Sequence, residues 1–175
     1  HRYPSNWGLP EFGQAAAAFY RRRFGVELDP AKEFLPLLGA KEGLAHVCMA
    51  LLDANDLALV PDPGYPVYSG GSILMGAEVR YLKLRPDRGF LPDLDELSEQ
   101  EAQRAKVLFI GYPNNPTAAV ADKDFFARVV DFCKEYHIVA VHDAAYTELA
   151  YDGFKAPSFL EVPGARELGI EFHSL

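Results

Sequence analysis

The chain has 175 residues, of which 49% are hydrophobic, 24% charged and 13% aromatic, and this composition is typical of a folded globular protein rather than a disordered chain. A formal net charge of -8 argues against nucleic acid or an anionic membrane as the main partner. The longest apolar runs are too short to cross a bilayer and no signal-like segment opens the chain, so we predict a cytoplasmic protein.

The first half of the chain alternates helical and strand patterns. A helix is predicted from Pro10 to Phe24, with its apolar residues on one face and three arginines near its end, where they suit the helix dipole. Gly39 precedes a second helix, predicted from about Lys41 to Ala54. A short buried strand is predicted from Asp56 to Val60, and a turn rich in proline and glycine ends it.

The second half continues the alternation with strands and one well-marked helix. Further strands are predicted at Glu78–Leu84, Lys106–Gly111, Ile138–His142 and Ile170–His173. Asp122 is a candidate N-cap for a helix that is predicted to run to Tyr136. Because several strands are almost continuously apolar, we predict an α/β fold with a mostly parallel sheet and helices on both faces. In such sheets ligands bind at the carboxyl ends of the strands.

The two cysteines, Cys48 and Cys133, lie far apart in helical segments. Their spacing fits neither a disulfide framework nor a metal site, so we interpret them as buried thiols in a reducing compartment and predict no metal. A single domain is expected at this length. The chain starts at His1 rather than Met and stops directly after a predicted strand, so we expect a piece of a longer protein.

Polar residues follow two of the predicted strand ends. The turn Tyr112–Thr117 holds two asparagines between two prolines, and a rigid local turn explains it about as well as a binding site does. The segment His142–Tyr146 puts Asp143 where an apolar strand leaves the sheet. A partly buried carboxylate needs a partner, which a bound cation or a protonated heterocycle would supply.

Two further segments could bind a ligand at the same edge. Gly39–Gly43 opens directly into a helix, whose free N–H groups favour an anion such as phosphate. No P-loop or GxGxxG motif is present, so this signal alone is weak. Tyr65 lies between Gly and Pro in a restricted backbone that suits an aromatic ring lying flat on a ligand, although Tyr65 and Tyr68 taken singly are better explained as core aromatics.

Together these segments resemble the fold-type I pyridoxal-phosphate-dependent aminotransferases of class I/II, in particular the group of the LL-diaminopimelate and aspartate or alanine aminotransferases. The resemblance rests on GLPEF (8–12), GAKEG (39–43), VPDPGYPVY (60–68), YPNNPT (112–117), HDAAY (142–146) and EFHSL (171–175). It implies that residues 1–175 form part of the large, cofactor-binding domain, without the small domain. The implied cofactor is pyridoxal 5'-phosphate.

The resemblance also implies a role for residues that would hold the phosphate and the ring. The backbone N–H groups of Ala40 and Lys41 and the hydroxyl of Ser174 match phosphate ligands, and Tyr65 matches the aromatic that stacks on the pyridine ring. Tyr3 matches a tyrosine that reaches the phosphate of the neighbouring subunit. The implied assembly is a homodimer with shared sites.

Three residues match the contacts in the plane of the ring. Asn115 and Tyr146 match the groups that bond the phenolic oxygen, and Asp143 matches the carboxylate that pairs with the ring nitrogen. Asp143 and Tyr146 are therefore the candidate catalytic residues, because a protonated ring nitrogen makes the ring an electron sink. The lysine that forms the Schiff base in the family is expected two residues after Leu175, so the chain by itself should be inactive.

One position departs from the family pattern. Ala118 stands where the family usually has glycine, which would alter the loop if the position requires positive φ. The resemblance predicts an aminotransferase that acts on amino acids and 2-oxo acids. Alternatives on the same fold are a β-lyase and an aminotransferase-like sensor domain of a transcriptional regulator, and a domain without a ligand is the remaining alternative.

Overall fold

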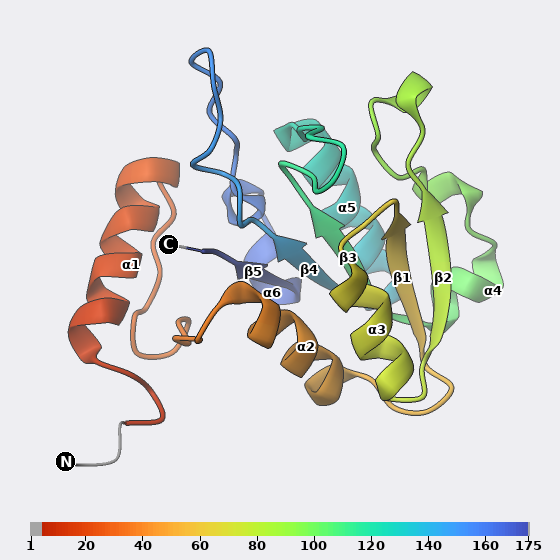
Figure 1. The fold of residues 1–175 in the computed structure, drawn as a ribbon, viewed down its shortest axis with the longest axis horizontal. Coiled ribbons are helices and arrows are strands. Elements are labelled where there is room, and N and C mark those ends of the chain that lie inside the picture. The colour runs from red at the N-terminus through yellow and green to blue at the C-terminus, as the bar shows by residue number, and fades with distance from the viewer. Residues whose placement is uncertain (1–4, 175) are drawn as a thin grey trace. The chain divides into compact units, whose positions relative to one another are not determined.

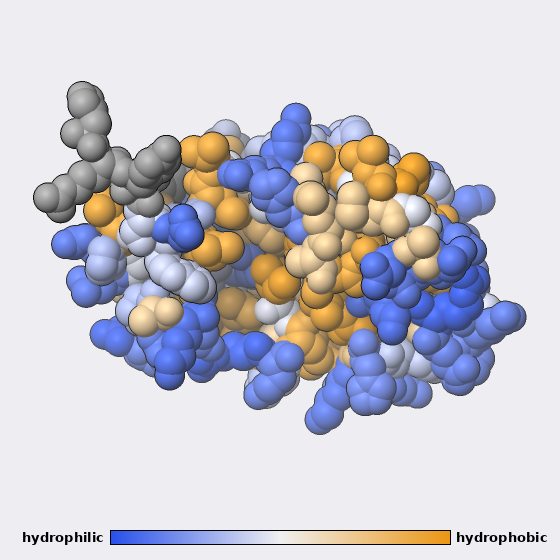
Figure 2. Space-filling model, turned by 90° about the horizontal axis from the view of Figure 1, so that it is seen from below, coloured by the Kyte–Doolittle hydropathy of each residue, from blue (hydrophilic) through white to orange (hydrophobic). Residues whose placement is uncertain are grey.

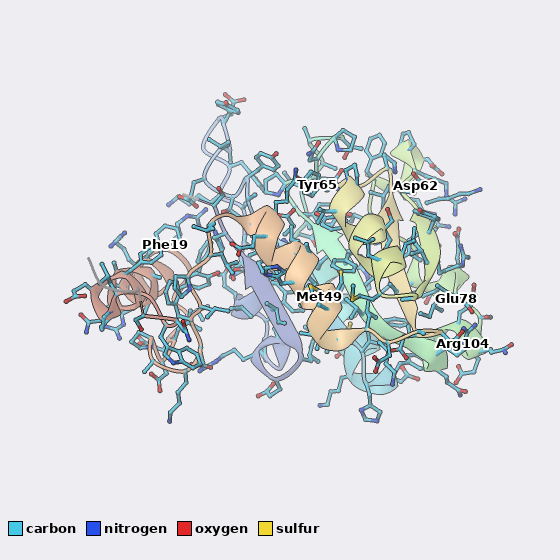
Figure 3. All side chains as sticks on the ribbon, turned by 60° about the horizontal axis from the view of Figure 1, so that its bottom comes forward. Phe19, Met49, Asp62, Tyr65, Glu78 and Arg104 are labelled. Atoms are coloured by element: carbon cyan, nitrogen blue, oxygen red, sulfur yellow. The ribbon has the colours of Figure 1, made fainter. Side chains whose placement is uncertain are left out.

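The computed structural model describes residues 5–174, and the chain divides into two compact units, one up to Leu38 and one from Gly39 onward. The first unit contains helix α1 (Pro10–Phe24), which has the predicted bounds. Proline begins the helix, and Gly25 ends it in the left-handed conformation with φ 70°, where glycine lacks the steric cost of a Cβ. The ring of Phe19, visible in Figure 3, packs edge-to-face on Phe24 with 5.7 Å between centroids.

The second unit is built on a five-stranded sheet in which every neighbouring pair is parallel, in the order β2-β1-β3-β4-β5 (Figure 1). The strands are β1 (Leu57–Asp62), β2 (Glu78–Lys83), β3 (Ala105–Gly111), β4 (Val139–Asp143) and β5 (Gly169–Phe172). All lie within two residues of their predicted bounds. The strands β1 and β3 are almost wholly buried, which explains their continuous apolar sequences.

Helices cover both faces of this sheet, as predicted. They are α2 (Ala40–Leu51), α3 (Pro66–Leu74), α4 (Glu99–Arg104), α5 (Lys123–Tyr136) and α6 (Ala165–Leu168), with short 3-10 turns at Pro86–Arg88, Leu94–Glu96 and Phe159–Glu161. In Figure 1, α2 and α3 lie in front of the sheet and α5 lies behind it. The Asp122 side chain accepts a hydrogen bond from the backbone N–H of Phe125 at 2.7 Å, which confirms the predicted N-cap of α5.

Two helices differ from the sequence prediction. Helix α2 ends at Leu51 rather than Ala54, because Leu52 already has an extended backbone that leads towards β1. Helix α3 was not predicted, since its adjacent glycines lower its intrinsic helix propensity. Gly71 is nevertheless required there: a Cβ atom at this position would lie 2.8 Å from the Sγ of Cys48, so the glycine permits α2 and α3 to pack closely.

The largest part of the core lies between α5 and the sheet. Its members include fully buried aromatic rings, of which Phe126 packs edge-to-face on Phe159 with 5.6 Å between centroids. Cys48 and Cys133 are buried free thiols, as predicted, and burial raises the pKa of Cys133 to about 12. Within residues 5–174, no helix is long and apolar enough to cross a membrane, and no cluster of His, Cys, Asp and Glu is suited to a metal ion.

The order in which the chain adds strands to the sheet reverses between β1 and β3. After β1 the chain passes through α3 to β2 on one side, and it then returns through α4 to β3 on the other side of β1. Ligands of open α/β sheets bind beyond the carboxyl ends of the strands at such a switch point. The segments that follow β1 and β3 are therefore the first place to look for a site.

Candidate functional site

The two ends of the sheet differ in chemistry. Figure 3 shows Asp62 and Tyr65 at one end of the sheet and Glu78 and Arg104 at the other. Glu78 begins β2, and its Oε2 lies 2.9 Å from Nη2 of Arg104 in an exposed ion pair. The end marked by Asp62 and Tyr65 is the carboxyl end, and the candidate residues that follow β1, β3 and β4 gather there.

Asp143 is the last residue of β4 and is half-buried. Its Oδ2 accepts a hydrogen bond from the hydroxyl of Tyr68 at 2.8 Å, and its Oδ1 accepts one from the backbone N–H of Ala145 at 3.3 Å. Two carboxylate oxygens offer about four acceptor positions. Asp143 can therefore accept a further hydrogen bond from a ligand while the protein holds it in place.

The aromatic ring of Tyr65 lies next to Tyr68, the residue that donates to Asp143. Tyr65 is the N-cap of α3 with φ -71° and ψ 127°, and its ring packs edge-to-face on Tyr68 with 5.9 Å between centroids. The Nζ atom of Lys41 lies 5.8 Å from the centroid of the Tyr65 ring. The start of α2, the ring of Tyr65 and the carboxylate of Asp143 thus form one connected group.

The first turn of α2 has the features of an anion site. Gly39 is its N-cap, so no side chain caps the helix, and the first N–H groups of a helix have no partner within it. A Cβ atom placed on Gly39 would meet nothing within 4 Å, which shows open space at the helix start. The N–H groups of Ala40 and Lys41 are suited to a phosphate here.

The turn after β3 separates the roles of its two asparagines. Asn114 is buried: its Nδ2 donates to the carbonyl of Gly111 at 3.1 Å, and its Oδ1 accepts from the hydroxyl of Thr117 at 2.8 Å and from the N–H of Thr117 at 3.3 Å. Asn115 is exposed, and among the described residues its side chain has no hydrogen-bond partner. The rigid-turn interpretation therefore applies to Asn114, while the amide of Asn115 is available to a ligand.

A cavity of about 500 Å³ joins this turn to the segment after β4. Its lining consists of Pro113, Asn114, Asn115, Pro116, Ala118, Val120, Tyr146, Leu149, Ala150, Tyr151 and Phe154. Asn115 and Tyr146 thus line the same space, and Tyr146 is 41% exposed, so its hydroxyl can be reached by a ligand. The sheet edge brings together two residues that are separated by a whole helix and strand in the sequence.

Ala118, at the position where the family usually has glycine, adopts the left-handed backbone conformation. Its φ is 57°, and its N–H donates to the carbonyl of Asn114 at 2.8 Å to close the turn. The turn therefore keeps a glycine-like backbone although alanine occupies the position.

The remaining two predicted phosphate ligands are Ser174 and Tyr3. Ser174 lies two residues after β5 and is exposed, and its role towards a phosphate stays a prediction. Tyr3 lies outside the described residues. Its role towards a neighbouring subunit stays a prediction.

Behind the site lies a buried charged network that the sequence did not reveal. Glu171 on β5 is directly opposite His142 on β4, and its Oε2 is 2.7 Å from the Nδ1 of His142. The Nε2 of His142 lies 3.2 Å from the carbonyl of Tyr112, which can only accept a hydrogen bond. Both nitrogens of His142 therefore face acceptor oxygens, and its side chain is fully buried together with that of Glu171.

Three more groups among the described residues contact Glu171. Its Oε1 accepts from the hydroxyl of Ser158 at 2.7 Å and lies 3.1 Å from the Nε2 of His173, and its Oε2 accepts from the backbone N–H of Phe159 at 2.8 Å. Burial alone would raise the pKa of Glu171, but the hydrogen bonds and charges of His142 and His173 outweigh it and hold that pKa well below the ordinary value. The charged form of the carboxylate is therefore favoured, and its contacts join β4, β5 and the start of the 3-10 turn at Phe159–Glu161.

Sequence reasoning missed Tyr68 and the pair of His142 and Glu171 as parts of the site. Tyr68 was interpreted only as a core aromatic, and its partner Asp143 is 75 residues away. His142 and Glu171 stand inside the segments that carried the resemblance, and that clustering was the only signal of a structural role. Periodicity cannot reveal such contacts, because it reports the face of an element rather than its partner.

The donors and acceptors at this edge fit pyridoxal phosphate. An uncapped helix start suits the phosphate, an aromatic ring stands beside it, an amide and a phenol line one cavity, and a carboxylate is held with spare acceptor capacity. All of these groups belong to the second compact unit, whose internal arrangement places them at one edge of one sheet.

The chain is similar to known proteins over its whole length. The sequence model of the family described as aminotransferase class I and II matches residues 1–169. Over all 175 residues the chain is 59% identical to the LL-diaminopimelate aminotransferase of Desulforudis audaxviator and 53% identical to that of Moorella thermoacetica. It covers 45% of each of these relatives, so the chain spans about half the length of the curated proteins it matches.

Solved structures show the same similarity in three dimensions. The substrate-bound structure of BacF from Bacillus subtilis superposes with a TM-score of 0.96 at 41% identity, over 99% of this chain and 44% of that chain. An aminotransferase from Staphylococcus aureus gives a TM-score of 0.94 at 34% identity, over 99% of this chain and 46% of that chain. At these identities the likeness extends beyond the general fold.

Proposed function

Since the chain belongs to the class I and II aminotransferase family, we propose that the whole protein transfers an amino group from an amino acid to a 2-oxo acid with pyridoxal phosphate as cofactor. The observation that carries the proposal is Asp143, a carboxylate at the carboxyl end of β4 that the protein orients and leaves with spare acceptor capacity. The names of the relatives with 59% and 53% identity favour LL-diaminopimelate, a diamino dicarboxylic acid, as one substrate.

Each residue of the site would have a separate task in binding the cofactor. The N–H groups of Ala40 and Lys41 would donate to the phosphate, helped by the dipole of α2, and the hydroxyl of Ser174 would add a third donor. Tyr65 would cover one face of the pyridine ring. Tyr3 would act on the phosphate of the neighbouring subunit. These contacts would fix the ring in one orientation over the edge of the sheet.

The remaining residues would act in the plane of the ring. Asn115 and Tyr146 would bond its phenolic oxygen from the shared cavity, and Asp143 would hold a proton on its nitrogen. When bound, the cofactor supplies an electron sink for the electron pair left behind when the substrate loses its α proton. By holding the proton on the nitrogen, Asp143 maintains the positive charge that this sink requires, which is why we place it in the catalytic group together with Tyr146.

Assembly and location belong to the same proposal. The outer surfaces of α2 and α3 expose Met49, Ile73 and Leu74 at 62%, 59% and 80%, and Figure 2 shows apolar surface on the face of the molecule seen from below. Exposed apolar clusters of this kind favour a partner, and a second copy of the chain is the partner that we propose. Two free buried thiols favour a reducing compartment, so we place the protein in the cytoplasm.

The test is a paired substitution in the whole protein that contains this chain. Asp143→Ala should lower the turnover number by two or more orders of magnitude, because the charge on the cofactor is lost. The protein should still fold, with a melting temperature lowered by the loss of the acceptor for the buried hydroxyl of Tyr68. The control is Asp131→Ala, which removes an exposed carboxylate of α5. Near-normal turnover of Asp143→Ala would overturn the assignment. Continued turnover without an acceptor 2-oxo acid, beyond one equivalent of product per cofactor, would indicate a lyase instead.

A further inference from the structure

The hydroxyl of Tyr68 links two parts of the site that are 75 residues apart in the sequence. Tyr68 lies in the first turns of α3, after β1, and donates to Oδ2 of Asp143 at the end of β4, across the end of β3. Its ring is 2% exposed and stacks on Phe109 of β3 with 5.1 Å between centroids and 12° between planes. The stacking on Phe109 and the hydrogen bond to Asp143 therefore fix the phenol by contacts within the protein alone.

The neighbouring strand leaves room for this hydrogen bond. Gly111 ends β3 and is paired in register with Asp143. A Cβ atom on Gly111 would lie 2.9 Å from the hydroxyl of Tyr68 and 3.6 Å from the Cβ of Asp143. Glycine is thus the residue that permits the phenol to approach the carboxylate, and any larger residue would have to displace one of them.

The phenol also keeps its proton. Burial raises the pKa of Tyr68 far above its ordinary value, and the charge and the hydrogen bond of Asp143 raise it further. A phenol that stays protonated is a constant donor at every pH at which the protein functions. Its contact with the carboxylate therefore has a fixed direction, from Tyr68 to Asp143.

We propose that Tyr68 is a positioning residue of the cofactor site, which donates to Oδ2 of Asp143, fixes the plane of this carboxylate and occupies one of its acceptor positions. A carboxylate that already accepts from Tyr68 has less tendency to take the proton of a ligand donor. The proton shared with the ring nitrogen then stays on the nitrogen. The inference rests on the proposed function, since it concerns how Asp143 meets the cofactor of that reaction.

The proposal is tested with Tyr68→Phe in the whole protein, loaded with pyridoxal phosphate labelled with ¹⁵N in the ring. The nitrogen chemical shift reports the ring proton directly. Loss of a hydrogen bond to a charged group should shift the sharing of the proton between the ring nitrogen and Asp143 about tenfold towards Asp143, seen as a nitrogen chemical shift closer to that of a neutral ring, and weaken cofactor binding about tenfold. Gly111→Ala, which pushes the phenol away, should shift both quantities in the same direction.

The matched control is Tyr112→Phe. Tyr112 is another buried tyrosine with a single hydrogen bond from its hydroxyl, to the carbonyl of Phe90 at 2.8 Å. This substitution should cost similar stability and leave the nitrogen chemical shift and the cofactor affinity as they are in the wild type. An equal shift in Tyr112→Phe would mean a general loosening of the fold and would overturn the proposal.

The outcomes separate this inference from the proposed function. If the wild-type protein binds no pyridoxal phosphate, the proposed function is wrong. If the wild type binds it and Tyr68→Phe has the nitrogen chemical shift of the wild type, the proposed function stands and the role of Tyr68 is refuted. If Tyr68→Phe does not fold, the same measurements on Gly111→Ala decide the role of Tyr68. That variant keeps the phenol of Tyr68 but pushes it away from Asp143.

Discussion

Replacement of Glu171 by glutamine tests the buried network behind the site. The substitution keeps the size of the side chain but removes the charge that pairs with His142. His142 then either keeps an uncompensated buried charge or gives up one proton and one of its two hydrogen bonds. The hydroxyl of Ser158 and the ring of His173 can turn an acceptor towards the new amide, which limits the loss.

The expected cost follows from this geometry. Breaking a buried ion pair by removing one partner costs about 3–5 kcal/mol, and the adaptable partners place Glu171→Gln near the lower end, about 3 kcal/mol. For comparison, a domain has only about 5–15 kcal/mol of total stability. Both side chains of the pair are fully buried, so solvent screening gives no reason to reduce this value.

The assay is urea unfolding combined with hydrogen exchange of the amides of β4 and β5. Glu167→Gln is the control, because it makes the same chemical change on the exposed surface of α6. Glu171→Gln should lower the unfolding midpoint and speed exchange in both strands, whereas Glu167→Gln should do neither. A cost below about 1 kcal/mol for Glu171→Gln, equal to that of the control, would refute the ion pair.

Three further outcomes are expected. Because folding lowers the pKa of Glu171, the unfolded chain binds more protons in acid than the folded chain does. The free energy of unfolding should therefore fall as the pH drops below the ordinary glutamate value of 4.5. Urea titrations at several pH values should show a smaller fall in Glu171→Gln. Ala118→Gly should raise stability by about 0.5–1 kcal/mol, since the left-handed backbone at φ 57° costs alanine more than glycine loses in entropy, and an unchanged urea midpoint would contradict this. Asp122→Ala should cost about 1 kcal/mol by removing the cap on the N–H of Phe125, and Asp131→Ala, in the middle of α5, should cost far less in the same urea assay.

Most of the scaffold could be predicted because its elements have strong local patterns. The helix α5 has both a marked apolar stripe and a capping aspartate, and β3 is a continuous apolar run. Helix α3 could not be predicted, because its Gly71 is selected by close packing on Cys48 rather than by helix propensity. The local pattern there contradicts the tertiary structure, and the tertiary structure prevails.

The candidate site could be predicted only in part, for the same reason. The strand ends directed attention to Asp143 and Asn115, since the carboxyl ends of parallel strands meet at one edge. The contacts of Tyr68 with Asp143 and of Glu171 with His142 join elements that are distant in sequence, and no periodic pattern indicates them. Which of two adjacent asparagines is free also depends on turn geometry: Asn114 bonds the backbone of its own turn, and Asn115 does not.

Adjacent residues at the end of β4 face opposite environments. His142 packs against Phe126 and is sealed in the core, and the next residue, Asp143, meets Tyr68 on the other face of the sheet. Side chains alternate along a strand, so a slip of one residue would drive the carboxylate into an aromatic core and leave Glu171 without its cation. A single-residue insertion or deletion at His137, the turn before β4, would be far more damaging than any substitution there. The alternation of His142 and Asp143 thereby specifies the register of β4 in the sheet.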